Sequence, residues 1–219
     1  MTDSRSASIS GIAAAVLFVA GAALGIASHP GGSDRKVVSW WQDGGNRAHV
    51  WIGAALIVLA IISFVWYASG VRETLRRTGS ESLASLAFGA ALVFAALALV
   101  GDVFQLSIAA AIDFGTHFKL DPNTARLVDT FTYLPIFGGA MVLSLMAGAV
   151  SVGARRAGVF PRSLCYAGYV IAPALLLSVI LWGIPLALFG IWVVATSVVM
   201  LRRGSVEASD PRRRPALAS

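Results

Sequence analysis

The sequence contains a single cysteine, Cys165, and only three histidines, His29, His49 and His117. One cysteine excludes an internal disulfide and a dithiol redox centre. The metalloprotease pattern HExxH, a P-loop, a dinucleotide-binding fingerprint and an ordered Ser-His-Asp set are also absent. The chain therefore carries no recognisable catalytic set, and the sequence predicts no cofactor.

Charged residues are scarce as well. They make up 13% of the chain, whereas 57% of the residues are hydrophobic and the mean hydropathy is +0.78. An ordinary soluble domain carries about 25% charged residues. The deficit arises from long uncharged runs, and apolar runs of about 18 or more residues are typical of transmembrane helices. The sequence therefore predicts an all-α, polytopic membrane protein whose first partner is the lipid bilayer.

The apolar runs predict six transmembrane helices. Five blocks stand out, at residues 9–27, 48–69, 83–101, 134–152 and 164–201. The last block is long enough for two spans, because Gly183 and Pro185 permit a turn within it and proline suits the first turn of a new helix. We expect residues 1–201 to form one six-helix transmembrane domain, followed by a disordered tail at 202–219.

The basic residues predict the orientation of this bundle. Twelve of the seventeen fall on the side of the N-terminus: Arg5, Arg72, Arg76, Arg77, Arg155, Arg156, Arg162, Arg202, Arg203, Arg212, Arg213 and Arg214. Five fall on the other side: Arg35, Lys36, Arg47, Lys119 and Arg126. Because short cytoplasmic loops are enriched in Lys and Arg, both termini are expected to be cytoplasmic. No aromatic residues interleave with base-reading side chains, so the net charge of +6 does not indicate nucleic-acid binding.

The third and fourth spans are expected to extend beyond the outer face of the membrane. Helix-compatible sequence continues to about Ile112, and Asp121 followed by Pro122 is a good helix start. About ten residues of each helix would then project roughly 15 Å beyond the hydrocarbon. Between the first two spans, Val37, Val38, Trp40 and Trp41 suggest a short amphipathic turn on the outer leaflet.

Polar residues gather at the outer ends of these helices. One hypothesis places Asp102, Gln105, Asp129 and His49 around an outward-facing pocket for an ion or a small polar solute, because acidic residues in a membrane bundle are functional candidates. Arg126 is a fifth candidate ligand residue. The alternative is that they are solvated helix ends, with Arg126 pairing with Asp129 at i,i+3. Both carboxylates fall near the outer boundary, and the two interpretations remain open.

A metal site is a further candidate. Asp113 and His117 are spaced i,i+4, which would bring two ligands together on a helix. Gly115 lies between them and weakens a helix there. A membrane-embedded metal-dependent hydrolase is therefore a second alternative that rests on spacing alone.

Small residues recur at helical spacing in two spans. Gly21 and Gly25 form a GxxxG pair, and Ala140, Ser144 and Gly148 repeat the pattern in the fourth span. Such faces let helix backbones approach closely, either inside one bundle or against a membrane protein partner or a second copy of the chain. Packing inside the bundle is the simpler interpretation.

Residues 154–203 carry a family resemblance. An "R-x-G-x-x-P-R-x-L" pattern precedes two spans and a Trp-containing last helix, at Arg156, Gly158, Pro161, Arg162, Leu164 and Trp192. This region resembles the end of small six-span bacterial membrane proteins of a domain-of-unknown-function family. The resemblance implies the six-span fold and no activity. The scarcity of Lys and Asn beside abundant Ala, Gly, Val and Arg is typical of a GC-rich bacterium, so a bacterial plasma membrane is the expected location.

These observations predict function only in outline. The leading hypothesis is an accessory or partner-binding membrane protein, since glycine-rich helix faces are present and no catalytic set is recognisable. The first alternative is a protein that binds or transports a small solute or ion in the outer polar cluster. An enzyme is the third hypothesis.

Overall fold

The chain folds into helices over the whole of its described length. The computed structural model describes residues 2–25 and 32–209, with side chains for 5–25 and 32–203. In these ranges there is no strand, which confirms the all-α class. The elements are α1 (Thr2–Gly25), α2 (Asp34–Gln42), α3 (Gly44–Arg77), α4 (Glu81–Phe114), α5 (Pro122–Ala157), α6 (Arg162–Leu176), α7 (Ser178–Leu181) and α8 (Ile184–Ser209).

Five helices are long and apolar enough to cross a membrane: α1, α3, α4, α5 and α8. The expected fifth span is instead divided, because α6 has 15 residues and ends before the single turn of α7. Fifteen residues reach about 22 Å, less than the roughly 30 Å of a hydrocarbon core. The polytopic character is thus supported by five helices, and the sixth crossing stays a prediction.

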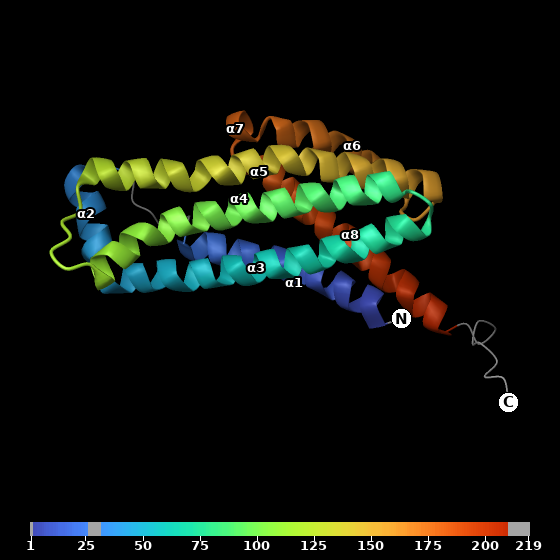
Figure 1. Cartoon of the computed structure of the whole chain (residues 1–219), viewed down its shortest axis with the longest axis horizontal. Coiled ribbons are helices and arrows are strands. Elements are labelled where there is room, and N and C mark those ends of the chain that lie inside the picture. The colour runs from blue at the N-terminus through green and yellow to red at the C-terminus, as the bar shows by residue number, and fades with distance from the viewer. Residues whose placement is uncertain (1, 26–31, 210–219) are drawn as a thin grey trace.

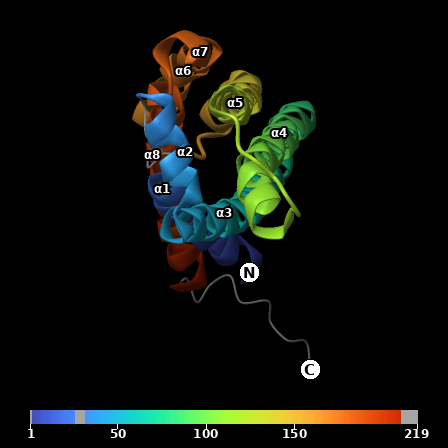
Figure 2. The ribbon, with the colours of Figure 1, turned by 90° about the vertical axis from the view of Figure 1, so that its left-hand side faces the viewer.

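The helices form a closed ring when the bundle is viewed along its length (Figure 2). Each helix packs against the next in the order α1, α3, α4, α5, α6 and α8, and α8 packs against α1 to close the ring. The main hydrophobic core lies inside this ring, and its fully buried side chains include Tyr67, Leu75, Leu143, Met146 and Leu175. Van der Waals packing of these side chains holds the helices together.

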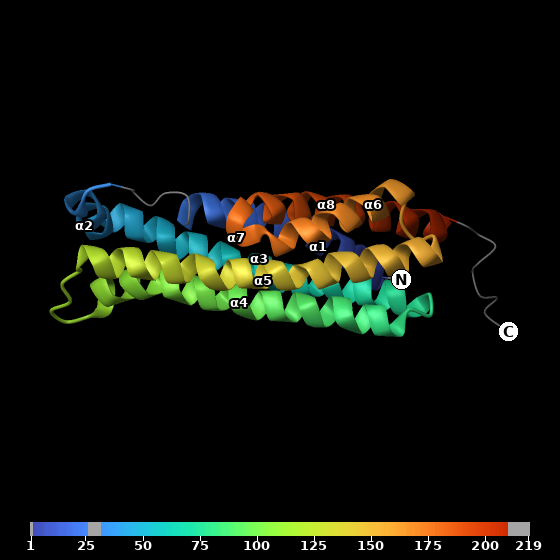
Figure 3. The ribbon, with the colours of Figure 1, turned by 90° about the horizontal axis from the view of Figure 1, so that it is seen from above.

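The two ends of the bundle differ. Figures 1 and 3 show that α3, α4 and α5 run its full length, whereas α1, α6, α7 and α8 occupy only the part farther from α2. The start of α1 and the last turns of α8 lie together at the end opposite α2. We call the protruding part the α2 lobe, which comprises α2 and residues 44–53, 105–114 and 122–132.

The α2 lobe has a small hydrophobic core of its own. Val37 and Trp41 of α2 are buried against Val50 of α3, Ile108 of α4 and Ala125 of α5. These two residues were expected to lie on the outer leaflet, but they pack on protein instead. Their i,i+4 spacing puts both on one face of α2, and that face meets the ends of the three long helices.

The helix boundaries near the α2 lobe follow local sequence signals. The Asp121 carboxylate accepts a hydrogen bond from the Thr124 amide at 2.9 Å, and Pro122 is the first residue of α5, as expected. Helix α4 continues to Phe114, so both helices extend past their apolar stretches. After the turn that follows α7, α8 begins at Ile184 with Pro185 in its first turn, also as expected.

Helix α8 continues through Ser209, past residue 202 where the disordered tail was expected to begin. The disordered tail itself stays a prediction. Once a helix is nucleated, each added residue extends it at little cost, and Arg203 donates a hydrogen bond to the Gly158 carbonyl at 3.1 Å. Residues 210–219 lie outside the described residues.

The GxxxG pair of α1 packs inside the bundle. A Cβ on Gly21 would lie 2.8 Å from the Gly53 carbonyl oxygen, and a Cβ on Gly53 would lie 2.8 Å from the Gly25 amide nitrogen. Glycine at these positions lets α1 and α3 approach closely. In α5, Ala140 and Ser144 are buried within the bundle as well, whereas Gly148 is half-buried and nothing lies within 4 Å of the position of its Cβ.

Candidate functional site

Two polar side chains are buried on one face of α4. Asp102 is 5% exposed and Gln105 is 4% exposed. They lie at i and i+3, so they share one face of the helix, and Ala98 and Ala109 of that face are buried as well. The sequence placed these two residues at a membrane boundary, but burial was not evident from it.

Neither side chain is satisfied within the described part of the chain. The Gln105 Nε2 atom is buried there without a hydrogen-bond partner. No described residue donates a hydrogen bond to the Asp102 carboxylate, although its oxygens are not among the fully enclosed unpaired atoms. A buried polar group normally has a partner, because leaving it unpaired costs about 1–3 kcal/mol.

Glycine in α1 makes room for the Gln105 amide. A Cβ on Gly25 would lie 2.9 Å from Gln105 Nε2. The amide of α4 therefore reaches the C-terminal end of α1, at the point where α1 stops and the α2 lobe begins. This contact sets the depth of Gln105 in the bundle.

A break in the helices lies close to the depth of Asp102. Gly101 faces α5 so closely that a Cβ on it would lie 2.6 Å from the Thr132 carbonyl oxygen. The next residue of α5, Tyr133, packs on the Trp182 ring with centroids 5.5 Å apart. Trp182 connects α7 to α8 with φ of 55°, a left-handed conformation that is unfavourable for a bulky residue. Strained backbone of this kind often marks a functional site.

The other candidate ligand residues are less buried. His49 is exposed on α3 next to the buried Val50, and no described contact joins it to Asp102 or Gln105. Asp129 is half-buried on α5 and has an interaction partner. Of the five candidate ligand residues, only Asp102 and Gln105 are buried, and they share one helix face.

Arg126 attaches α2 to α5. Its Nη2 atom donates to the Asp34 carboxylate at 2.6 Å and to the Gly32 carbonyl at 3.1 Å. The i,i+3 spacing in the sequence had suggested Asp129 as the partner of Arg126. The ion pair to Asp34 is largely exposed, so we assign it a modest contribution to stability.

Arg47 is a structural residue that the sequence did not indicate. Its Nη1 atom donates to the carbonyls of Trp41 and Gln42 at 2.8 Å each, and its Nε atom donates to Asp113 at 2.6 Å. The Trp51 indole donates to the same carboxylate at 3.0 Å. One guanidinium thus satisfies the last carbonyls of α2 and joins α3 to α4, as a basic side chain at a helix C-terminus can.

The proposed metal pair lacks the helical spacing on which it rested. Helix α4 ends at Phe114, Gly115 is its C-cap, and His117 adopts φ of 65° in the following turn. Asp113 is occupied by Arg47 and Trp51. Across the described ranges, no group of three or more His, Cys, Asp or Glu side chains could hold a metal ion.

A second buried polar contact lies nearer the other end of the bundle. The hydroxyls of Tyr67 in α3 and Thr196 in α8 are 2.6 Å apart, and both residues are fully buried. Thr196 also lies 2.9 Å from the Trp192 and Val193 carbonyls. All these groups satisfy one another, so this contact fastens two helices and leaves no group for a ligand.

Comparison with known proteins leaves the site to be judged on its own geometry. No family model, curated protein or solved structure matches the chain. The resemblance of residues 154–203 to a six-span bacterial family therefore stays an expectation.

Proposed function

We propose that this protein is a multi-pass membrane protein that binds a small cationic solute at Asp102 and Gln105, at the base of the α2 lobe. The observation that carries the proposal is the burial of Asp102 and Gln105, three residues apart on α4, with the Gln105 Nε2 donor unpaired in the described part of the chain. The expected setting is a bacterial plasma membrane with both termini cytoplasmic and the α2 lobe outside.

The lengths of the helices support this setting. Helix α1 ends beside Gln105, and the turn between α7 and α8 packs on Tyr133. A bilayer whose outer boundary lies at this level would cover α1, α6, α7 and α8, and the α2 lobe would project beyond it. The exposed rings of Phe104, Phe131 and Trp182 lie within a few residues of this level, where aromatic side chains are enriched in membrane proteins.

The chemistry of the pair supports a cationic ligand. An ionised carboxylate removed from water needs an opposite charge or strong donors, because its desolvation costs several kcal/mol. Asp102 would supply the charge. The Gln105 amide offers one acceptor and two donors, of which Nε2 is unpaired in the described part of the chain. A cationic group would pair with the Asp102 carboxylate and with the Gln105 Oε1 acceptor, whereas the Nε2 donor needs an acceptor on the same solute, such as a hydroxyl or carbonyl oxygen.

The helix break supports access to this pair from the α2 lobe side. In membrane transporters, interrupted helices expose backbone groups next to the solute. Here the α7–α8 turn lies near the depth of Asp102, next to Tyr133 and Thr132 of α5. Solute access along this turn would avoid the main hydrophobic core.

Melting of the full-length protein in detergent tests the proposal. Mg²⁺, Ca²⁺ and methylammonium chlorides are compared with choline chloride at equal ionic strength. A ligand at roughly a hundred times its Kd should raise the melting temperature by about 5–10 °C. We expect at least one probe to do so, and we expect Asp102→Asn to abolish the shift.

Asp43→Asn is the matched control. It removes the same charge from the junction of α2 and α3, and Asn caps the start of α3 as well as Asp does. It should keep the full response. Equal responses in both variants, or no response of the parent to any probe, would contradict the solute site and favour the accessory, partner-binding hypothesis.

A further inference from the structure

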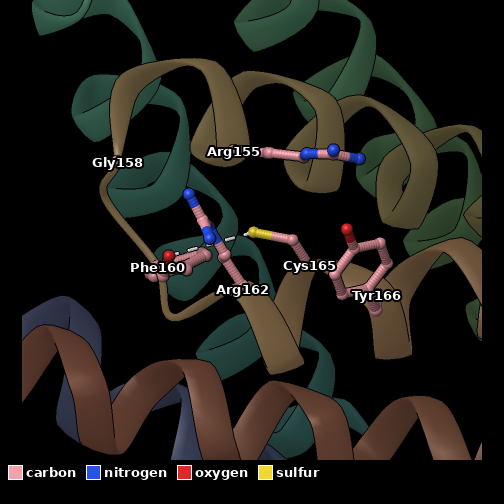
Figure 4. A pocket seen from close by; sticks show the side chains of 6 residues that line it. All are labelled: Arg155, Gly158, Phe160, Arg162, Cys165 and Tyr166. Atoms are coloured by element: carbon pink, nitrogen blue, oxygen red, sulfur yellow. Dashed lines mark hydrogen bonds between the residues drawn. The ribbon is translucent and has the colours of Figure 1, made fainter.

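A second site lies at the end of the bundle opposite the α2 lobe. A pocket of about 430 Å³ opens where α5 turns into α6, and it is lined by Arg155, Gly158, Phe160, Arg162, Cys165 and Tyr166 (Figure 4). None of these residues belongs to the site at Asp102. We call it the α5–α6 pocket.

Two guanidinium groups approach the pocket from different helices. Arg155 lies in the last turn of α5, and Arg162 is the first residue of α6. Figure 4 shows the Arg162 guanidinium beside the turn at Gly158 and that of Arg155 above the Tyr166 ring, 5.1 Å from its centroid. The left-handed Gly158, with φ of 64°, reverses the chain and brings the two helices together.

These positive charges have no acidic counterpart among the described side chains. The described ion pairs involve neither Arg155 nor Arg162, and Arg162 makes no described hydrogen bond. Two guanidinium groups lining one pocket repel each other, and an anion between them removes that repulsion. The planar fork of arginine matches the oxygens of a phosphate group.

The surface next to the pocket is apolar. Tyr166 is 51% exposed and Val170, one helical turn further along α6, is 69% exposed. Arg155 itself follows closely on the apolar stretch of α5, so the pocket lies at the depth of lipid headgroups. An acyl chain could follow Tyr166 and Val170 while its phosphate lies between the arginines.

We propose that the α5–α6 pocket binds a phosphate group, supplied by an anionic phospholipid, through Arg155 and Arg162. Basic pockets between transmembrane helices bind such headgroups. The proposal is independent of the solute site, because it uses neither the same residues nor the same end of the bundle.

The test measures lipid binding to the full-length protein in detergent, by melting temperature and by native mass spectrometry. Phosphatidylglycerol is compared with phosphatidylcholine, and inorganic phosphate is added separately to distinguish a lipid from a free anion. We expect phosphatidylglycerol alone to raise the melting temperature by about 5–10 °C near a hundredfold excess over its Kd. Arg162→Gln should weaken its affinity by about tenfold to a hundredfold.

Two further variants separate the site from general surface charge. Arg156→Gln removes the same charge one residue from Arg155 but outside the pocket lining, so it should bind the lipid as the parent does. Arg162→Lys keeps the charge without the fork and should restore only part of the affinity. In the absence of lipid, all three variants should have the same melting temperature as the parent.

Each outcome decides the proposal. A response to inorganic phosphate with the same dependence on Arg162 would support the phosphate site and identify a free anion as its source. Equal losses in Arg156→Gln and Arg162→Gln would overturn the proposal, because general surface charge would then explain binding. No response to either phosphatidylglycerol or phosphate would overturn it as well.

Discussion

Arg47 and Asp113 form an ion pair at 2.6 Å that joins the first turn of α3 to the last turn of α4, between residues 66 positions apart in sequence. The same guanidinium holds the carbonyl end of α2. Arg47 of α3 therefore links α2 and α4 within the α2 lobe.

Replacement of Arg47 by Met should loosen the α2 lobe. The variant leaves two backbone carbonyls without a donor and removes one of the two donors to the Asp113 carboxylate, so we expect the lobe to lose about 1–3 kcal/mol of stability. Hydrogen exchange should accelerate over residues 34–53. Arg35→Met removes the same charge from an exposed position of α2 and should exchange as the parent does. Unchanged exchange in Arg47→Met would contradict the role given to Arg47.

The close approach of α1 and α3 predicts a sharp difference between two glycines. Gly53→Ala places a methyl group within 3.0 Å of backbone atoms of Gly21 and Gly25. We expect it to lower the free energy of unfolding by about 1–3 kcal/mol. Gly89→Ala meets nothing within 4 Å and should be neutral or stabilising by up to about 1 kcal/mol. Equal melting temperatures for the two variants would argue against this packing.

The buried hydroxyl pair predicts an asymmetry. Thr196→Val leaves the Tyr67 hydroxyl buried without an acceptor, which should cost about 1–3 kcal/mol. Tyr67→Phe costs less, about 0.5–1.5 kcal/mol, because Thr196 can still donate to the Trp192 or Val193 carbonyl. Unfolding at increasing concentrations of a denaturing detergent measures the loss of stability in both variants. A larger loss of stability in Tyr67→Phe than in Thr196→Val would contradict the assignment of the Tyr67 hydroxyl as donor and the Thr196 hydroxyl as acceptor.

The expected orientation can be tested with cysteines at the two ends of the bundle. In a Cys165→Ala background, Thr116→Cys lies in the α4–α5 connection and Ser82→Cys lies at the start of α4, and both positions are exposed. An impermeant maleimide added to intact cells should label only Thr116→Cys, because the basic loops are expected to be cytoplasmic. Labelling of Ser82→Cys alone would invert the orientation, and both cysteines should react once the cells are lysed.

Local signals in the sequence were sufficient for most helix boundaries. The cap at Asp121, the proline at Pro122 and the turn before Pro185 act on neighbouring backbone groups, so a few residues determine them. The division between α6 and α7 was missed. Residue 177, where the helix breaks, is a leucine and not a glycine, so the local sequence did not indicate the break.

The candidate site was recognised only in part, and its geometry depends on distant contacts. Asp102 and Gln105 were identified by their residue type near an apolar run. His49 was grouped with them by depth alone, but depth does not fix the direction of a side chain around a helix. The partner of Asp113 was not evident either, since Arg47 lies in another helix.

The sequence by itself determined most of the helical secondary structure of this protein and indicates its surroundings. Its long uncharged runs are typical of helices in a bilayer, where the backbone satisfies its hydrogen bonds by forming helices. Only the tertiary structure decided which faces those helices bury. Trp41 packs on three helix ends rather than on lipid, and Asp102 and Gln105 lie inside the ring, because burial depends on which helices become neighbours. That choice follows from side-chain packing between segments far apart in the chain.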